Sequence, residues 1–251
     1  MDLNLSGRRA VVLAGTAGLG RGVCEALAQE GCTVVTCGRT PVAGGPPEIT
    51  ALACDIRQAN PLDAFLTSAL ELLGGVDILV TNSGGPRPGV TSDLSDDDWE
   101  GAFSSLVMPV IRACRRLTPL MAAQGRGVVI NTASISALRP LPGLSLSNVL
   151  RPAVVGLSRT LAAELAPSGV RVNCLLPGPF ATRRSEEYAQ WQAARTASDP
   201  DPAPRADTAA VPLGRLGAVE EFGRMAAFLA SDQSAYCTGS SICLDGGVSL
   251  Y

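Results

Sequence analysis

The stretch of sequence that decides the fold is Leu13-Ala14-Gly15-Thr16-Ala17-Gly18-Leu19-Gly20. It follows an apolar run over residues 9–14, which is typical of a β-strand, and it leads into helical periodicity over residues 18–29. Gly18 and Gly20 would let the backbone approach a pyrophosphate at the N-terminus of that helix. A tight strand–helix turn without a ligand is the alternative interpretation, because a glycine-rich turn alone is a weak signal.

The rest of the chain alternates short apolar runs with longer helical stretches. Strands are predicted over 9–14, 33–37, 49–54, 77–81, 127–131, 170–175 and 241–244, and helices over 18–29, 95–123, 148–166 and 219–231. Continuous apolar strands that alternate with helices indicate a parallel sheet covered on both faces. We therefore expect one doubly wound, Rossmann-type α/β domain over residues 1–251, with about seven parallel strands.

Composition narrows the range of partners and compartments. The net charge is −3 and no basic cluster is present, so nucleic acid is not an expected partner. The eight cysteines are scattered without a CxxC pair, which fits a reducing cytosol. The N-terminus lacks the pattern of a signal peptide, and no apolar run reaches membrane-spanning length. We expect a cytoplasmic protein that acts on a small-molecule substrate without a membrane partner.

The basic residues limit the available chemistry. The chain has no histidine, and all 20 basic residues are arginine. Histidine triads and histidine-ligated metals are thereby excluded, and no metal is expected. No lysine amine is available for acid–base work or for a Schiff base. Any proton transfer must use serine, tyrosine, a carboxylate, cysteine, arginine or water.

The segment 181–212 departs from the strand–helix rhythm, since it is rich in Ala, Pro, Asp and Arg. One interpretation is a linker to another domain, but too little chain follows to build one. A mobile substrate lid over the carboxyl ends of the strands is the favoured interpretation.

Several motifs, in order along the chain, resemble those of the short-chain dehydrogenase/reductase family. They are the glycine-rich turn, Cys54-Asp55-Ile56, Leu79-Val-Thr-Asn-Ser-Gly84, Arg171-Val-Asn-Cys-Leu-Leu-Pro-Gly-Pro-Phe-Ala-Thr182 and Leu244-Asp-Gly-Gly247. The resemblance covers nearly the whole chain. The family's fingerprint has a glycine where this chain has Ala14, which leaves room for a shifted turn. Asn82 and Asp245 are expected to stabilise turns rather than to touch a ligand.

The resemblance implies a dinucleotide cofactor and the residues that hold it. These residues are Ala14, Gly15, Gly18, Leu19, Gly20, Arg39, Asp55, Ile56, Asn82, Gly84, Arg151, Pro177, Gly178 and Thr182. Family members that prefer NAD carry an acidic residue at the end of the second strand, where this chain has Gly38 followed by Arg39. An arginine there can pair with a 2′-phosphate, so NADP(H) is favoured over NAD(H). A solvated surface arginine is the alternative.

The resemblance also identifies the catalytic positions, and most of them are altered. The family uses Asn, Ser, Tyr and Lys, in which Tyr exchanges the proton and Lys holds the ribose. Ser134 fills the serine position, Ser147 stands thirteen residues later where Tyr belongs, and Arg151 stands four residues beyond that in place of Lys. Leu106 stands where the family has Asn. Ser134, Ser147 and Arg151 are thus the candidate catalytic residues, and together they could form an anion or oxyanion pocket or merely a polar helix start.

These substitutions have chemical consequences. The alkoxide of serine is far more basic than the phenolate of tyrosine, and the serine side chain is shorter by a ring. Ser147 therefore cannot deliver a proton as tyrosine does. Arg151 stays charged and cannot shuttle a proton. Tyr188 in the 181–212 segment is a candidate substitute donor. Pro109 is expected to kink the long helix and to free the carbonyl of Ser105, and Pro152 should either kink its helix or set its first turn.

Three functions stay open at this point. The first is an NADP(H)-dependent oxidoreductase that acts on a small carbonyl or alcohol by a non-standard proton pathway. The second is a catalytically silent nucleotide-binding or scaffold homologue. The third is non-redox chemistry like that of the halohydrin dehalogenases, which carry arginine at the lysine position but retain the tyrosine that this chain lacks. The resemblance further implies a homo-dimer or homo-tetramer.

Overall fold

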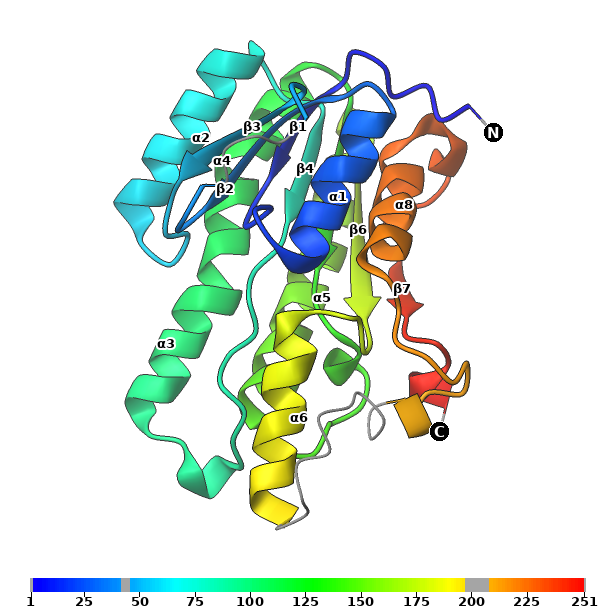
Figure 1. Ribbon diagram of the computed structural model, residues 1–251. Coiled ribbons are helices and arrows are strands. Elements are labelled where there is room, and N and C mark those ends of the chain that lie inside the picture. Colours follow the sequence, from blue (N-terminus) through cyan, green and yellow to red (C-terminus); the bar gives the residue numbers. More distant parts are fainter. Residues whose placement is uncertain (1, 42–45, 197–207, 251) are drawn as a thin grey trace.

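A seven-stranded parallel sheet forms the centre of the molecule. The computed structural model describes residues 2–41, 46–196 and 208–250, and its strand order is β3-β2-β1-β4-β5-β6-β7 (Figure 1). The strands are β1 (Arg9–Val12), β2 (Thr33–Gly38), β3 (Ile49–Ala53), β4 (Ile78–Thr81), β5 (Gly127–Thr132), β6 (Val170–Pro177) and β7 (Ser241–Leu244). All the paired strands are parallel, which confirms the expected doubly wound α/β class.

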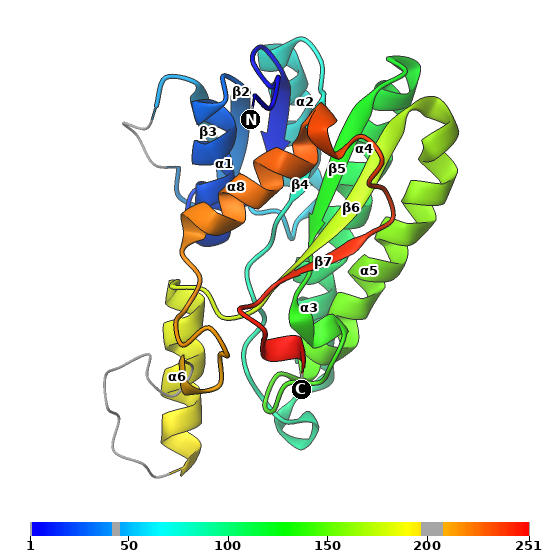
Figure 2. The same ribbon diagram turned by 90° about the vertical axis from the view of Figure 1, so that its right-hand side faces the viewer.

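Helices cover both faces of the sheet. They are α1 (Gly18–Gln29), α2 (Ala59–Leu73), α3 (Asp96–Leu106), α4 (Met108–Ala123), α5 (Ser145–Leu165), α6 (Arg183–Thr196) and α8 (Val219–Ala230). In Figure 2, α1 and α8 lie on one side of the sheet and α4 and α5 on the other. Each side has its own apolar core, and successive residues of β1 serve them alternately. Val11 packs towards α2 and α4, while Ala10 and Val12 pack towards α1 and α8.

Two glycines let α1 and α8 pack backbone to backbone. A methyl group on Gly22 would overlap the carbonyl of Val219, and one on Gly223 would overlap the carbonyl of Gly22. The close approach brings the start of α8 beside α1, at the edge of the sheet where the strands end.

The expected long helix over residues 95–123 is divided in two. Ser95 begins α3 with a capping box, in which its hydroxyl accepts from the Asp98 amide. The helix ends at Leu106, and α4 starts at Met108 with Pro109 in its first turn. The kink expected at Pro109 takes the form of a break at Val107, because a proline has no amide hydrogen to continue the hydrogen-bond ladder.

The helix expected over residues 148–166 begins three residues earlier, at Ser145. Pro152 consequently lies inside α5 rather than in its first turn, and the first turn instead contains Ser147. Helix α6 occupies part of the expected lid, and both ribbon views place it beyond the carboxyl ends of the strands (Figures 1 and 2). The proline-rich part of that lid, residues 197–207, lies outside the described residues.

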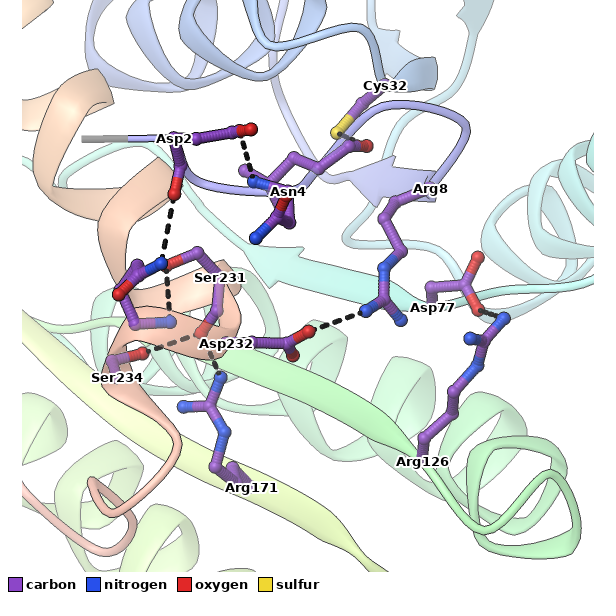
Figure 3. Close-up of polar contacts among 12 residues, drawn as sticks. Asp2, Asn4, Arg8, Cys32, Asp77, Arg126, Arg171, Ser231, Asp232 and Ser234 are labelled. Carbon is purple, nitrogen blue, oxygen red and sulfur yellow. Dashed lines mark hydrogen bonds and ion pairs between the residues drawn. The ribbon is translucent and has the colours of Figure 1, made fainter.

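A network of charged residues joins the amino ends of the strands (Figure 3). Asp77 accepts from the Arg9 guanidinium at 2.8 and 3.1 Å and pairs with Arg126 at 3.3 Å. Arg8 pairs with Asp232 at 3.1 Å. Arg171 donates to the carbonyls of Leu229 and Ser231, at the end of α8. A cavity of about 70 Å³ lies among these side chains, at the edge of the sheet opposite the glycine-rich turn.

Two further findings concern the expectations from composition. All eight cysteines, which lie within the described ranges, are free thiols. In the parts of the chain that the structure describes, no helix combines the length and the apolarity needed to cross a bilayer.

Replacement of Asp77 by Asn should destabilise the fold in a pH-dependent way. Burial disfavours the charged carboxylate, but the hydrogen bonds from Arg9 outweigh it and lower the pKa of Asp77 below its ordinary value of 3.8. Its contribution is thus complete above that value and lost as the pH falls through the lowered pKa. We expect Asp77→Asn to reduce the free energy of unfolding by about 2 kcal/mol at pH 7.

Urea unfolding at several pH values measures this effect. The difference between the wild type and Asp77→Asn should shrink as the pH falls below 3.8. Asp63→Asn is the matched control, because Asp63 is 71% exposed and lies 3.9 Å from Arg116, so its loss should cost little. A difference for Asp77→Asn that stays constant from pH 7 to strongly acidic pH would contradict the assignment.

Candidate functional site

The turn between β1 and α1 is held from three sides. The Gly15 amide donates to the Cys37 carbonyl and to Thr36 Oγ1, each at 3.0 Å. A methyl group on Gly15 would overlap Thr36, and one on Gly20 would overlap the Ala14 carbonyl. The Asn82 side chain donates to that same carbonyl at 3.2 Å, which confirms its expected role in stabilising the turn.

Ala14 adopts a backbone conformation that suits glycine. Its φ is +50°, in the left-handed region, where a Cβ atom is crowded by the following carbonyl. The turn is thus formed in spite of the alanine, at some cost in backbone strain.

The N-terminus of α1 is open to a ligand. Ala17 precedes the helix and supplies no side-chain cap, so the first amides of α1 are free of side-chain acceptors among the described contacts. A hollow of about 370 Å³ lies beside the first two turns of α1, and it is lined by Gly18, Arg21, Glu25, Ala181, Thr182, Arg183, Val219 and Glu220. Uncapped amides at a helix N-terminus favour an anion, so the N-terminus of α1 itself fits the pyrophosphate of a dinucleotide.

The turns after β6 and β7 complete this edge. The Thr182 side chain lies close to Gly18, 3.8 Å from the position that a Cβ atom on Gly18 would take. A methyl group on Gly178, after Pro177, would overlap Asp245. Asp245 accepts from the amides of Gly247 and Ser249, which confirms its expected turn-stabilising role. The structure therefore brings the glycine-rich turn and the Pro177–Thr182 motif together.

The ends of β2 and β3 form the other half of the expected nucleotide site. Gly38 ends β2 beneath Thr16, and any side chain on Gly38 would overlap that residue. Arg39 follows with an exposed side chain. Asp55 pairs with Arg57 at 2.6 Å, and the hydrogen bonds from Arg57 lower the pKa of Asp55. Ile56 packs partly against the core. This end of β2 thus presents a cation and no carboxylate of its own.

The hydroxyl groups of three serines lie between β5 and α5. Ser134 follows β5, and its Oγ accepts from the Ser136 amide at 3.1 Å. Ser136 Oγ lies 2.9 Å from Ser147 Oγ, and both side chains are buried. Ser136 was not among the residues predicted from the sequence. Its contact with Ser147 depends on the short helix over Ile135–Ala137, which the apolar periodicity of the sequence does not predict.

Arg151 is buried, with only 6% of its surface exposed. Its Nη1 donates to the Thr132 carbonyl at 3.0 Å and to Ser83 Oγ at 3.4 Å, and its Nη2 donates to the Gly84 carbonyl at 3.2 Å. Its Nε has no hydrogen-bond partner among the described residues. Burial, and to a lesser degree the charge on Arg184, lower the pKa of Arg151 to about 10, so the guanidinium is still protonated at neutral pH.

The position of the family's asparagine is filled by an apolar side chain. Leu106 is completely buried at the end of α3. It offers no group to hold a water molecule.

Tyr188 and Trp191 fasten α6 to the loop before α5. The Tyr188 hydroxyl donates to the Pro142 carbonyl at 2.7 Å, and the Tyr188 and Trp191 rings stack 6.1 Å apart. A methyl group on Gly143 would overlap the Trp191 ring. Farther along α6, Arg195 pairs with Asp93 at 3.0 Å. Helix α6 therefore covers the loop that leads to Ser147.

Comparisons with known proteins agree with this arrangement. A family model described as enoyl-(acyl carrier protein) reductase matches residues 13–249. The chain is 31% identical to oxidoreductase UcpA of Escherichia coli K12, over 98% of this chain and 96% of that protein. It is also 31% identical to human dehydrogenase/reductase SDR family member 4, over 97% of this chain and 88% of that protein.

Two solved structures are similar over almost their full length. L-sorbose reductase of Gluconobacter frateurii, complexed with NADPH and L-sorbose, is 29% identical, with a TM-score of 0.90 and complete coverage of both chains. A variant of actinorhodin polyketide ketoreductase with NADPH is 26% identical, also with a TM-score of 0.90, over 97% of this chain and 98% of that one.

Replacement of Ala14 by Gly should stabilise the protein. Glycine adopts the left-handed conformation without steric cost, and this gain exceeds the loss of backbone entropy. We expect Ala14→Gly to raise the free energy of unfolding by about 0.5–1 kcal/mol, measured by urea denaturation. The same change at Ala28, within α1, should lower it by a similar amount. Destabilisation by both variants would show that Ala14 is unstrained.

Proposed function

The chain belongs to the short-chain dehydrogenase/reductase family, and we propose on this basis that it is an NADP(H)-dependent oxidoreductase that acts on a small carbonyl or alcohol. The observation that carries the proposal is the uncapped N-terminus of α1 at the carboxyl edge of the sheet. Dinucleotides bind at this place in doubly wound folds.

NADP(H) suits the residues at the end of β2. Gly38 offers no carboxylate to bind a ribose 2′-hydroxyl or to repel a phosphate, and the exposed Arg39 is free to pair with a 2′-phosphate. NADPH is present in the two similar structures described above. NAD(H) is the alternative cofactor.

Different parts of the cofactor would contact different residues along the carboxyl edge of the sheet. The amides of Gly18, Leu19 and Gly20 would face the pyrophosphate, Asp55 and Ile56 the adenine, and Gly84 and Arg151 the ribose. Gly15 and Asn82 would shape the turn, because their N–H groups already donate within the protein. Pro177, Gly178 and Thr182 would face the nicotinamide. The bound nicotinamide would supply hydride transfer, and the protein would supply position and polarity.

Three side chains would then act on the reacting oxygen. Ser134 accepts from the Ser136 amide through its oxygen, which leaves its hydroxyl proton for a substrate oxygen. Ser147 shares a hydrogen bond with Ser136 and so fixes the loop that carries Ser134. Arg151 stays protonated, so it supplies a fixed positive charge and does not transfer a proton to the substrate. The proton itself would come from water, from an acidic substrate or from Tyr188.

Tyr188 is a poor match for the family's tyrosine. Its hydroxyl proton is engaged by the Pro142 carbonyl at 2.7 Å, and α6 would have to shift to release it. We propose that Tyr188 instead secures α6 as part of a substrate lid over residues 181–212.

A catalytically silent nucleotide-binding homologue is the second candidate, and one observation favours it. Leu106 is completely buried at the position of the family's asparagine, and Ser147 is buried against Ser136 at the position of its tyrosine. Buried packing thus occupies the places where the family has the asparagine of its water relay and the phenol of its tyrosine.

Assembly and location complete the proposal. We propose a homo-dimer or homo-tetramer in the cytoplasm. The exposed apolar side chains of Leu120 on α4 and Val149 on α5 support an interface on these helices.

Nucleotide titration tests the proposed cofactor. Quenching of tryptophan fluorescence should show that NADPH binds more tightly than NADH. Arg39→Ala should weaken NADPH about tenfold, through loss of the pairing with the 2′-phosphate, and should leave NADH unchanged as the internal control. Failure of both nucleotides to bind at millimolar concentration would refute the oxidoreductase proposal.

Turnover of NADPH with a panel of carbonyl compounds tests the role of Ser134. Ser134→Ala should lower kcat/KM about 10- to 100-fold without changing the affinity for NADPH. Ser145→Ala is the matched control, because the Ser145 hydroxyl bonds to Thr91. The silent homologue is favoured instead if NADPH binds, no carbonyl is reduced, and the combined variant Leu106→Asn, Ser147→Tyr and Arg151→Lys is active.

A further inference from the structure

Two arginines from different helices converge on the segment that follows β4. Arg151 of α5 donates to Ser83 Oγ and to the Gly84 carbonyl. Arg184, in the first turn of α6, lies against the next residue, Gly85. A Cβ atom on Gly85 would overlap the Arg184 side chain, with Cζ only 2.9 Å away. The two guanidinium groups therefore share one short stretch of backbone.

Neither arginine has an acidic partner among the described residues. Most other arginines of the described chain form ion pairs with Asp or Glu. The charge of Glu187 favours protonated Arg184, but the Glu187 carboxylate forms its ion pair with Arg183 at 2.8 Å. Arg151 reaches only carbonyl and hydroxyl oxygens, and its Nε reaches none.

Burial makes this arrangement costly without an anion. Arg151 is 6% exposed and Arg184 is partly buried. Burial lowers the pKa of both side chains, and the charge on Arg184 adds to the effect on Arg151. Two like charges in a poorly solvated site destabilise each other, and a bound anion would relieve both.

We propose that Arg184, with the positive charge of Arg151 behind it, binds the carboxylate of an anionic substrate, so that the oxidoreductase acts on a small carbonyl or hydroxy compound that bears a carboxylate. This assignment rests on the proposed function, since it names the substrate class of the same site. The planar guanidinium of Arg184 matches a carboxylate by two parallel hydrogen bonds, which an ammonium group does not. Arg151 contributes charge, because both its Nη atoms donate to protein oxygens and its Nε is buried.

The position of Arg151 favours the substrate over the phosphates of the cofactor. Arg151 donates to the Thr132 carbonyl, two residues before Ser134, so its charge lies beside the loop that carries the Ser134 hydroxyl. The pyrophosphate has its own site at the N-terminus of α1, next to Gly18. Cofactor phosphate is nevertheless the other source of the same chemistry, and the experiment separates the two.

Malonate and its neutral analogue malonamide serve as probes, and thermal unfolding of the full chain reports binding. Malonate should raise the Tm of the wild type and malonamide should not. Arg184→Gln should need at least about tenfold more malonate for the same rise. The control Arg159→Gln removes the same charge from the exposed face of α5 and should respond like the wild type. Arg184 forms no hydrogen bond within the described part of the chain that the substitution would break, and Arg184→Lys should be intermediate.

Three results would overturn the assignment. One is an equal response of Arg184→Gln and the wild type to malonate, and another is an equal response to malonamide and malonate. The third is competition between malonate and NADPH, together with a loss of NADPH affinity in Arg184→Gln, which would assign the pair to cofactor phosphate. Failure of the proposed function would give a different result. NADPH would not bind, whereas malonate would still raise the Tm of the wild type more than that of Arg184→Gln.

Discussion

The buried guanidinium of Arg151 organises the carboxyl edge of the sheet. A cation in this position must be surrounded by acceptors, and it takes them from the end of β5 at Thr132 and from the segment after β4 at Ser83 and Gly84. These hydrogen bonds join α5 to two neighbouring strand ends. Because every acceptor is a neutral oxygen, the bonds fix the geometry but leave the positive charge uncompensated. The same side chain therefore holds the site together and sets its preference for anions.

A second constraint acts at the turn between β1 and α1. The turn needs a left-handed residue at position 14, and the chain supplies alanine. Gly15 and Gly20 allow the close contacts with Thr36 and the Ala14 carbonyl, and Asn82 donates to that carbonyl from the end of β4. These contacts hold the turn in place in spite of the strain. The uncapped helix N-terminus is thus positioned by tertiary contacts as well as by the glycines.

The site joins preserved and altered parts of the family pattern. The nucleotide half keeps an open helix N-terminus and an exposed arginine after β2. In the catalytic half, Leu106 and the Ser136–Ser147 pair replace a proton relay with packing and a fixed loop. Helix α6 is tied over that loop through Tyr188 and Trp191. The structure thus combines a strand–helix turn of the family type with serine and arginine at the positions of the family's tyrosine and lysine.

The sequence by itself determined the strands and most of the helices, because apolar periodicity, glycine and proline act over a few residues, but it did not predict α2 or α6. It predicted the parallel sheet and a kink at Pro109, and the resemblance to a known family predicted the turn roles of Asn82 and Asp245. It did not predict the start of α5 at Ser145, which depends on contacts of the preceding loop. Only the tertiary structure brought Ser136 to Ser147, eleven residues away, and placed Arg151 and Arg184 at the same segment after β4, since no local sequence pattern predicts a contact that packing alone creates.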